Sequence, residues 1–281
     1  LAFNPSFDPD IEMHARNPVR DNLSKYPSIS GKRSAKIGFD MELAGSGTPG
    51  TAPPWGKLLK ACGFAETISS GVSVTYKPAS SSISSLTVAL YMDGTIKRTW
   101  GARGTVKITW EAGKPPIAHF EFTGADFEVV DGGLLSAVAF SAIIGPACLA
   151  TTFLVDTYAA LISKVEFDMQ NTLAKRIDMS SSSGIKSIAI TGRNPKGTFD
   201  PEDVLVTAWD IFGKWKTPGT LAAMSFNATG AAGNIMTVTM PKVRHSSVKL
   251  ADREGQNITN VEFEPTLSAT TGDDEISIVM T

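Results

Sequence analysis

The chain has 281 residues, of which 42% are hydrophobic and 19% charged, so it has the composition of a soluble globular protein and is long enough for two domains. Its 26 basic and 28 acidic side chains give a net charge of −2 without a basic stripe, which argues against a protein that grips nucleic acid. Cys62 and Cys148 stand in apolar contexts and are predicted to be buried thiols rather than a disulfide, which favours a reducing cytoplasmic origin.

Residues 1–31 contain four prolines and little apolar periodicity. This pattern predicts an extended arm or irregular lead-in rather than a packed element. We expect such an arm to become ordered against a neighbouring subunit.

Residues 32–132 are predicted to form a first β module. Their hydrophobic residues alternate with polar ones, as in the row Val106, Ile108 and Trp110, which faces away from Thr105, Lys107, Thr109 and Glu111. Such alternation is typical of an antiparallel sheet with one solvated face. Asp93-Gly94 is a hairpin turn signal between two such rows.

One helix interrupts this module. Pro53 and Pro54 open it, Gly63 closes it, and four apolar residues recur at helical spacing: Trp55, Leu58, Leu59 and Cys62. The spacing predicts a short amphipathic helix that packs with one face on the sheet.

Residues 133–160 are predicted to be an apolar linker or core segment. Leu134–Val155 carries no charge and is nominally long enough to span a bilayer. However, Gly145-Pro146 interrupts it, and it lacks the flanking basic and aromatic anchors of a membrane span. We therefore expect a buried linker or a pair of core strands, and no membrane insertion.

Residues 161–281 are predicted to form a second, similar β module. Asp200 followed by Pro201, with Gly213 beyond the last apolar residue, predicts a second helix. The segment Lys36–Met41 also resembles Lys164–Met169, at an offset of 128 residues. This echo, together with the matching order of elements, favours an internal duplication.

Three patterns that could carry chemistry have simpler interpretations. Gly45-Ser-Gly47-Thr-Pro-Gly50 matches a dinucleotide fingerprint, but the prolines that follow remove the amide donors that a phosphate needs. His14, His119 and His245 share no ligand spacing, and Asp273-Asp274-Glu275 is typical of a solvated turn more than of a cation site. We therefore predict no catalytic, cofactor-binding or metal-binding residues and no enzyme activity.

The chain resembles the tail tube (major tail) proteins of long, non-contractile-tailed bacteriophages. The resemblance rests on an ordered set of motifs over most of the chain: Glu42-Leu-Ala-Gly-Ser-Gly47, Pro53-Pro-Trp-Gly-Lys-Leu-Leu-Lys-Ala-Cys-Gly-Phe64, Val74-Thr-Tyr-Lys-Pro78, Asp93-Gly94, Gly101-Ala-Arg-Gly-Thr105, Ile190-Thr-Gly-Arg193, Gly233-Asn234, Met240-Pro-Lys242 and Gly272-Asp-Asp-Glu275. It implies a mostly β fold whose sheets join between subunits into a barrel, stacked as rings around a channel for DNA.

The resemblance also implies where the protein works and with what. It implies a virion protein of the phage tail, made in the cytoplasm of the host bacterium, with the tape measure, tail terminator and distal tail proteins as partners. With two modules a chain, a trimeric ring is favoured and a hexameric ring is the alternative. A ligand- or surface-binding β-sandwich module is the competing function, and it predicts exposed aromatic residues on loops.

Overall fold

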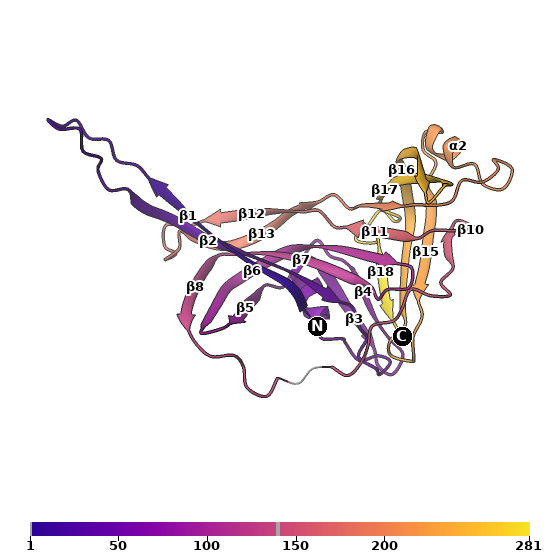
Figure 1. Cartoon of the computed structure of the whole chain (residues 1–281), viewed down its shortest axis with the longest axis horizontal. Coiled ribbons are helices and arrows are strands. Elements are labelled where there is room, and N and C mark those ends of the chain that lie inside the picture. Colours follow the sequence, from indigo (N-terminus) through magenta and orange to yellow (C-terminus); the bar gives the residue numbers. More distant parts are fainter. Residues whose placement is uncertain (1, 139–140) are drawn as a thin grey trace.

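The computed structural model describes residues 2–138 and 141–281 and consists mainly of antiparallel strands (Figure 1). The first half contains β1 (Ala2–His14), β2 (Ile29–Glu42), α1 (Gly56–Ala61), β3 (Phe64–Ser69), β4 (Ser73–Pro78), β5 (Leu86–Met92), β6 (Thr95–Glu111), β7 (Ile117–Gly124) and β8 (Asp126–Asp131). The second half contains β9 (Phe153–Val155), β10 (Tyr158–Ala160), β11 (Lys164–Asp168), β12 (Asn171–Ile177), β13 (Ile185–Arg193), β14 (Lys196–Phe199), α2 (Ile211–Lys216), β15 (Ala222–Ala228), β16 (Met236–Arg253), β17 (Gln256–Pro265) and β18 (Ser277–Met280). The mostly β fold class predicted from the alternating pattern is confirmed.

Two four-stranded sheets with the same connectivity form the centre of the molecule. The first has the spatial order β1-β2-β7-β6, and the second has the order β11-β14-β17-β16. If the four strands of each sheet are numbered 1 to 4 along the chain, their spatial order in both sheets is 1-2-4-3. All neighbouring strands are antiparallel. β6 also pairs with β11, so the two sheets join edge to edge within one chain.

The correspondence extends to the flanking elements. α1 follows β2 as α2 follows β14, and the first part of β6 lies between β5 and β8 as the first part of β16 lies between β15 and β18. Even a bulge recurs. β5 pairs Leu86 with Ala102 and then Val88 with Thr99, while β15 pairs Ala222 with Val243 and then Met224 with Met240. This shared irregularity aligns the two halves residue by residue, with Ala102 equivalent to Val243, and supports a tandem duplication.

The sequence echo that suggested the duplication has the wrong register. Lys36–Met41 lies in β2, whose counterpart is β14, whereas Lys164–Met169 begins with β11, the counterpart of β1. The β6–β7 hairpin has its counterpart in the β16–β17 hairpin. All strands in which apolar and polar residues alternate look alike in sequence, so only the observed strand pairing shows which strands are equivalent.

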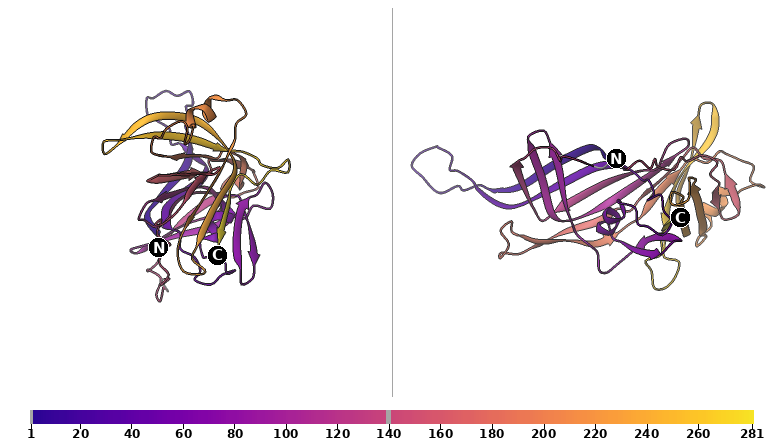
Figure 2. Two further views of the ribbon diagram at one scale, coloured as in Figure 1. Left: turned by 90° about the vertical axis from the view of Figure 1, so that its right-hand side faces the viewer. Right: turned by 90° about the horizontal axis from the view of Figure 1, so that it is seen from below.

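Each half carries a long hairpin arm between its first and second strands. β1 and β2 form the first arm, which projects far beyond the body, and β12 and β13 form the second, which runs in the same direction (Figures 1 and 2). Within the extended arm expected for residues 1–31, residues 2–14 form a strand paired with β2 and residues 15–28 form the connection at its tip. Lys175 Nζ lies 2.9 Å from Asp10 Oδ2, and the Arg33 amide donates to the Ser183 carbonyl, so the two arms touch.

The first predicted helix is confirmed and the second is misplaced. α1 follows Pro54, and Gly63 ends it with a φ of +84°. No helix begins at Asp200; α2 begins at Ile211, after Asp210, whose carboxylate accepts the Gly213 amide as an N-cap. Within the span of the misplaced helix, Leu205 is 79% exposed and Trp209 is buried.

One continuous core connects both halves. Trp110 of β6 packs edge-on against Phe226 of β15, with ring centroids 5.1 Å apart. The β3–β4 hairpin of the first half also pairs with β18 of the second, as in Ile278 opposite Tyr76. The two halves are thus joined by side-chain packing in the core and by two sets of paired strands, β6 with β11 and β4 with β18.

The uncharged segment between the halves runs along the surface. Leu134, Leu135, Val138, Ile144 and Leu149 are all at least 47% exposed, whereas Gly145, Pro146, Phe153 and Val155 are buried. The stretch before Phe153 thus differs from the buried linker expected from its composition, while β9 and β10 form a pair of strands with Phe153 and Val155 in the core. Among the described residues, no helix is long and apolar enough to cross a membrane.

Candidate functional site

The polar face of the two joined sheets is the candidate functional surface. On each strand, alternate residues are buried in the core, and the residues between them face away from it. The titratable side chains on this outer face include Asp8, Lys36, Asp40, Lys107, Glu111, His119, Glu121, Lys164, Glu166, Asp168, Lys196, Arg244, Lys249, Glu262 and Glu264. Among these residues the carboxylates outnumber the lysines and arginines, so the face carries a small acidic excess, which lies in the first half of the chain.

Ion pairs across neighbouring strands organise this face. Lys107 Nζ lies 2.7 Å from Glu166 Oε2, across the β6–β11 junction, and Lys164 also contacts Glu166. Burial alone would raise the pKa of Glu166, but the hydrogen bonds from Lys107 and Lys164 outweigh it and hold the pKa below its ordinary value. The pair Lys36–Glu121, 3.0 Å apart, repeats the arrangement across β2 and β7.

His119 is exposed on this face, as predicted from the alternation of its strand. Its Nδ1 lies 2.7 Å from Asp40 Oδ1, and Asn4 donates a second hydrogen bond to Asp40. The hydrogen bonds from Asn4 and His119 lower the pKa of Asp40. His119 is therefore one member of the charge lattice, and His14 and His245 lie elsewhere, on β1 and on the buried side of β16.

Such a face can hold water and counterions but is not suited to bind a polyanion. Lysines that are already paired with carboxylates have little free charge for phosphate, and the surplus of carboxylates repels it. A hollow of about 330 Å³ lies on the face between Lys107, Asp168, Lys196 and Glu262, and its lining is of mixed charge. The chemistry available is therefore passive, a hydrated and weakly acidic wall.

The motifs behind the family resemblance meet in pairs that lock the two halves together. Asn234 Oδ1 accepts the Gly45 amide at 2.6 Å, and Asn234 Nδ2 donates to the Ile144 carbonyl at 2.8 Å. A Cβ on Gly45 would lie 2.1 Å from the Gly233 carbonyl oxygen, so only glycine allows this approach. The glycines of the apparent dinucleotide fingerprint thus serve a backbone contact, not a phosphate.

The acidic cluster near the C-terminus has a similar role. Arg193 contacts Asp273 and lies 3.0 Å from Glu275, while Asp274 accepts the amides of Ser268 and Ala269. Hence the cluster is an ion-pair lock between β13 and the loop before β18, rather than a free solvated turn. Across the described residues, no group of three or more His, Cys, Asp or Glu side chains is placed to hold a metal ion.

Asp200, expected as a helix N-cap, instead ties β14 to its neighbours. Its carboxylate accepts the amides of Ser163 at 2.9 Å and Lys164 at 2.8 Å, and Arg253 Nη1 lies 3.0 Å away. No local sequence pattern predicts this contact, because Arg253 lies 53 residues further along the chain than Asp200. The same carboxylate chemistry that suits a cap suits any cluster of free amides.

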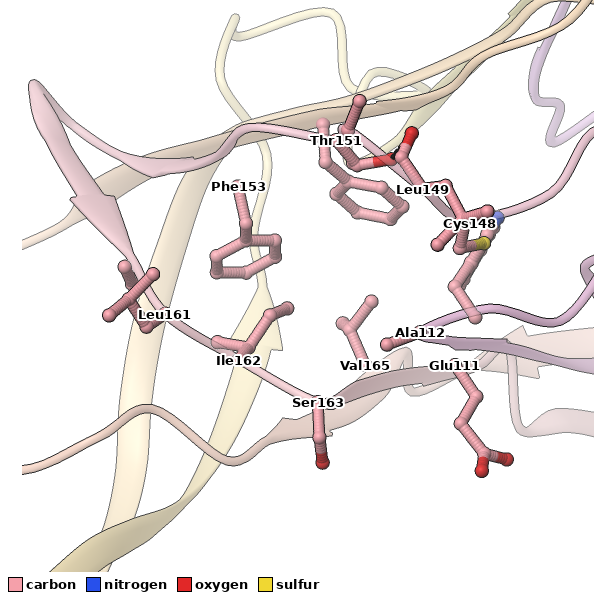
Figure 3. Close-up of a pocket in the computed structure, with 14 residues that line it drawn as sticks. Glu111, Ala112, Cys148, Leu149, Thr151, Phe153, Leu161, Ile162, Ser163 and Val165 are labelled. Carbon is pink, nitrogen blue, oxygen red and sulfur yellow. Dashed lines mark hydrogen bonds between the residues drawn. The ribbon is translucent and has the colours of Figure 1, made fainter.

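An apolar hollow of about 280 Å³ lies at one end of the β6–β11 junction (Figure 3). Cys148, Leu149, Phe153 and Ile162 gather around it, while the polar ends of Glu111 and Ser163 point away from these side chains (Figure 3). Burial raises the pKa of the Cys148 thiol to about 11, so the thiol is not an activated nucleophile. A ligand site normally has polar groups that converge on its occupant, and this hollow has none among its labelled lining residues.

The five tryptophans divide into a buried and an exposed set. Trp55, Trp110 and Trp209 are at most 6% exposed, whereas Trp100 is 36% and Trp215 is 37% exposed. The three buried rings are unavailable as the exposed loop aromatics that a sugar- or surface-binding module would use.

Comparison with known proteins identifies one family. The model of a family described as phage tail tube protein matches residues 3–278. No curated protein matches the chain.

Proposed function

This chain belongs to the phage tail tube protein family, and we propose that it polymerises as stacked rings whose common channel conducts phage DNA during ejection. The polar face of the joined sheets would line the channel. Its paired lysines and surplus carboxylates would leave DNA without strong contacts, so that the DNA slides instead of binding.

The observation that carries the proposal is the repeated strand order. Each half of the chain presents one four-stranded sheet, and β6 joins β11 so that the second sheet continues the first. The described strands close no barrel within one chain, so closure requires further copies. With two equivalent sheets a chain, we propose a ring of three chains that imitates six-fold symmetry; a ring of six chains is the alternative.

The two arms are proposed to make the contacts between successive rings. Their tips expose apolar side chains that nothing in the monomer covers: Val19 and Leu23 are fully exposed on the first, and Met179 is on the second. Exposed apolar residues at the end of a long hairpin are costly in water unless another surface covers them. Both arms project to the same side, as axial contacts require (Figure 1).

The proposed setting follows from the family. The protein would be made in the cytoplasm of the host bacterium, assemble around the tape measure protein, and join the tail terminator and distal tail proteins at the two ends of the tube. It would be structural and carry out no catalysis. A ligand-binding β-sandwich remains the competing function, but the three buried tryptophans and the hollow without convergent polar groups do not favour it.

Negative-stain electron microscopy of the purified protein tests the proposal. We expect tubes, or rings with a central hole in end-on views after rotational averaging. Compact single particles at high protein concentration, with no rings under any ionic condition, would contradict the proposal and favour the binding module.

A further inference from the structure

One chain already contains the kind of contact that could join two chains. At the internal junction, five consecutive pairs link β6 to β11, and three of them are Lys107 opposite Asp168, Ile108 opposite Phe167 and Thr109 opposite Glu166. Ile108 and Phe167 are fully buried there. The fourth spatial position of the first sheet thus pairs with the first position of the second.

The duplicated fold identifies the strands that would continue this pattern. In the second sheet the fourth position is β16, and in the first sheet the first position is β1. The alignment set by the common bulge makes Phe122 equivalent to Phe263 and Ile37 equivalent to Gly197. From these residues the alignment can be extended strand by strand along the observed pairs. β16 has one extra residue between His245 and Ser247, which shifts the numbering by one. The residues equivalent to Lys107, Ile108 and Thr109 are then Lys249, Leu250 and Ala251 on β16, and those equivalent to Asp168, Phe167 and Glu166 are Asp8, Phe7 and Ser6 on β1.

The residue types at these positions agree with the internal junction, although they were not used to align the halves. Lys249 stands where Lys107 stands and Asp8 where Asp168 stands, so a lysine again faces an aspartate. Leu250 and Phe7 correspond to the buried Ile108 and Phe167, yet Leu250 is 70% exposed in the monomer. A leucine on the core side of a strand is explained if a second copy covers it.

Both edges are free to pair. β1 is the end of the sheet, and among the described strands β16 pairs beyond Val243 only with β17. Trp215 of α2 donates to the Ser246 carbonyl, which lies before the positions Lys249–Ala251. Pro9 has no N–H, so in the regular ladder its position faces away from β2, and the free edge of β1 lacks that donor. A proline on an open edge discourages indiscriminate strand addition and leaves pairing to a partner that also matches in charge and shape.

We propose that β16 of one copy pairs antiparallel with β1 of the next copy, with Lys249 opposite Asp8, Leu250 opposite Phe7 and Ala251 opposite Ser6. This seam rests on the proposed function, because it is the contact that closes the ring. It reproduces between chains the junction that β6 and β11 make within a chain, so every boundary between sheets in the ring has one geometry.

Disulfide trapping tests the register. Because Pro9 faces the free edge, the neighbouring even-numbered residues of β1 occupy non-hydrogen-bonded sites relative to the incoming strand, where Cα atoms approach to about 4.5 Å, within disulfide range. We expect S6C/A251C in a C148S background to give covalent dimers and larger species on non-reducing gels after assembly. The matched control, S6C/S247C, moves one cysteine four residues along the same face, about 13 Å away, and should remain mostly monomeric.

The outcomes separate the seam from the function. If rings form but S6C/A251C gives no crosslinks, or the control crosslinks equally, the proposed pairing of β16 with β1 is wrong. The proposed tube function is not affected by that result. A wild-type protein that forms no rings would overturn both. If the cysteine variants fail to fold, a charge swap replaces them: K249E and D8K should each reduce assembly at least tenfold, and K249E/D8K should restore it, whereas unimpaired single variants would contradict the seam.

Discussion

His245 predicts how this protein responds to mild acid. The imidazole is 4% exposed, packs 6.1 Å from the ring of Phe199, and its Nε2 has no hydrogen-bond partner among the described residues. Burial, assisted by Lys214 and opposed by Asp156, lowers the pKa of His245 from its ordinary 6.5 to about 4. The native protein therefore holds this side chain neutral at pH values where an unfolded chain would protonate it.

The sign and size of the effect follow from linkage. Between about pH 6.5 and pH 4 the unfolded state binds a proton that the native state does not, so stability falls as the pH falls through this window. The full difference corresponds to about 3 kcal/mol, and about 2 kcal/mol is lost by pH 5, at about 1.4 kcal/mol for each pKa unit.

Urea denaturation at pH 7 and pH 5 measures this loss on monomers kept at low concentration. The His245→Phe variant keeps an aromatic ring against Phe199 and removes the titration. The wild type should therefore lose about 2 kcal/mol more than the variant between the two pH values. His119→Phe, at an exposed position, is the matched control. Equal losses in the wild type and His245→Phe would refute the reasoning, because carboxylates common to both proteins would then account for the whole pH dependence.

Three further perturbations test other parts of the structure. Asp200→Ala should lower the free energy of unfolding by about 3 kcal/mol, because it leaves two amides and the Arg253 guanidinium without their acceptor. The control Asp203→Ala, at an exposed position, should change it little, and equal effects of the two variants in urea titrations would contradict this role. Gly45→Ala should destabilise the protein by about 2 kcal/mol, because the added Cβ would clash with the Gly233 carbonyl. Gly133→Ala, which has open space around its Cβ, should leave the melting temperature unchanged. Replacing the arm tip, residues 16–27, by a short Gly-Ser turn should leave folding and single rings intact but stop their stacking; tubes of normal length in electron micrographs would disprove the axial role of the arm.

Local patterns were reliable where one physical rule decides the outcome. Strict alternation predicts a sheet with one solvated face, and residues 105–111 behave as expected, with Val106, Ile108 and Trp110 buried. Pro53-Pro54 and Gly63 bound a helix because prolines are tolerated before and at its start but not in its interior, and a glycine tolerates the left-handed end. Neither signal depends on distant residues.

The failures occur where distant residues decide. Asp200-Pro201 has the composition of a helix start, but backbone amides at Ser163 and Lys164 take the carboxylate instead. The uncharged stretch after Leu134 suggested burial, yet it crosses the surface between the two halves. The true register of the duplication depends on a bulge between strands and on pairing, which no six-residue match can reveal.

The central claim is that each chain supplies two equivalent sheets to a ring of three. A cryo-electron microscopy reconstruction of self-assembled tubes tests it most directly, because it counts the 29.8 kDa chains in each ring. We predict three chains and six similar wedges around the channel, with the acidic face of β6, β7 and β11 toward the lumen. Six chains in a ring, or a lumen lined by the opposite layer, would contradict the account.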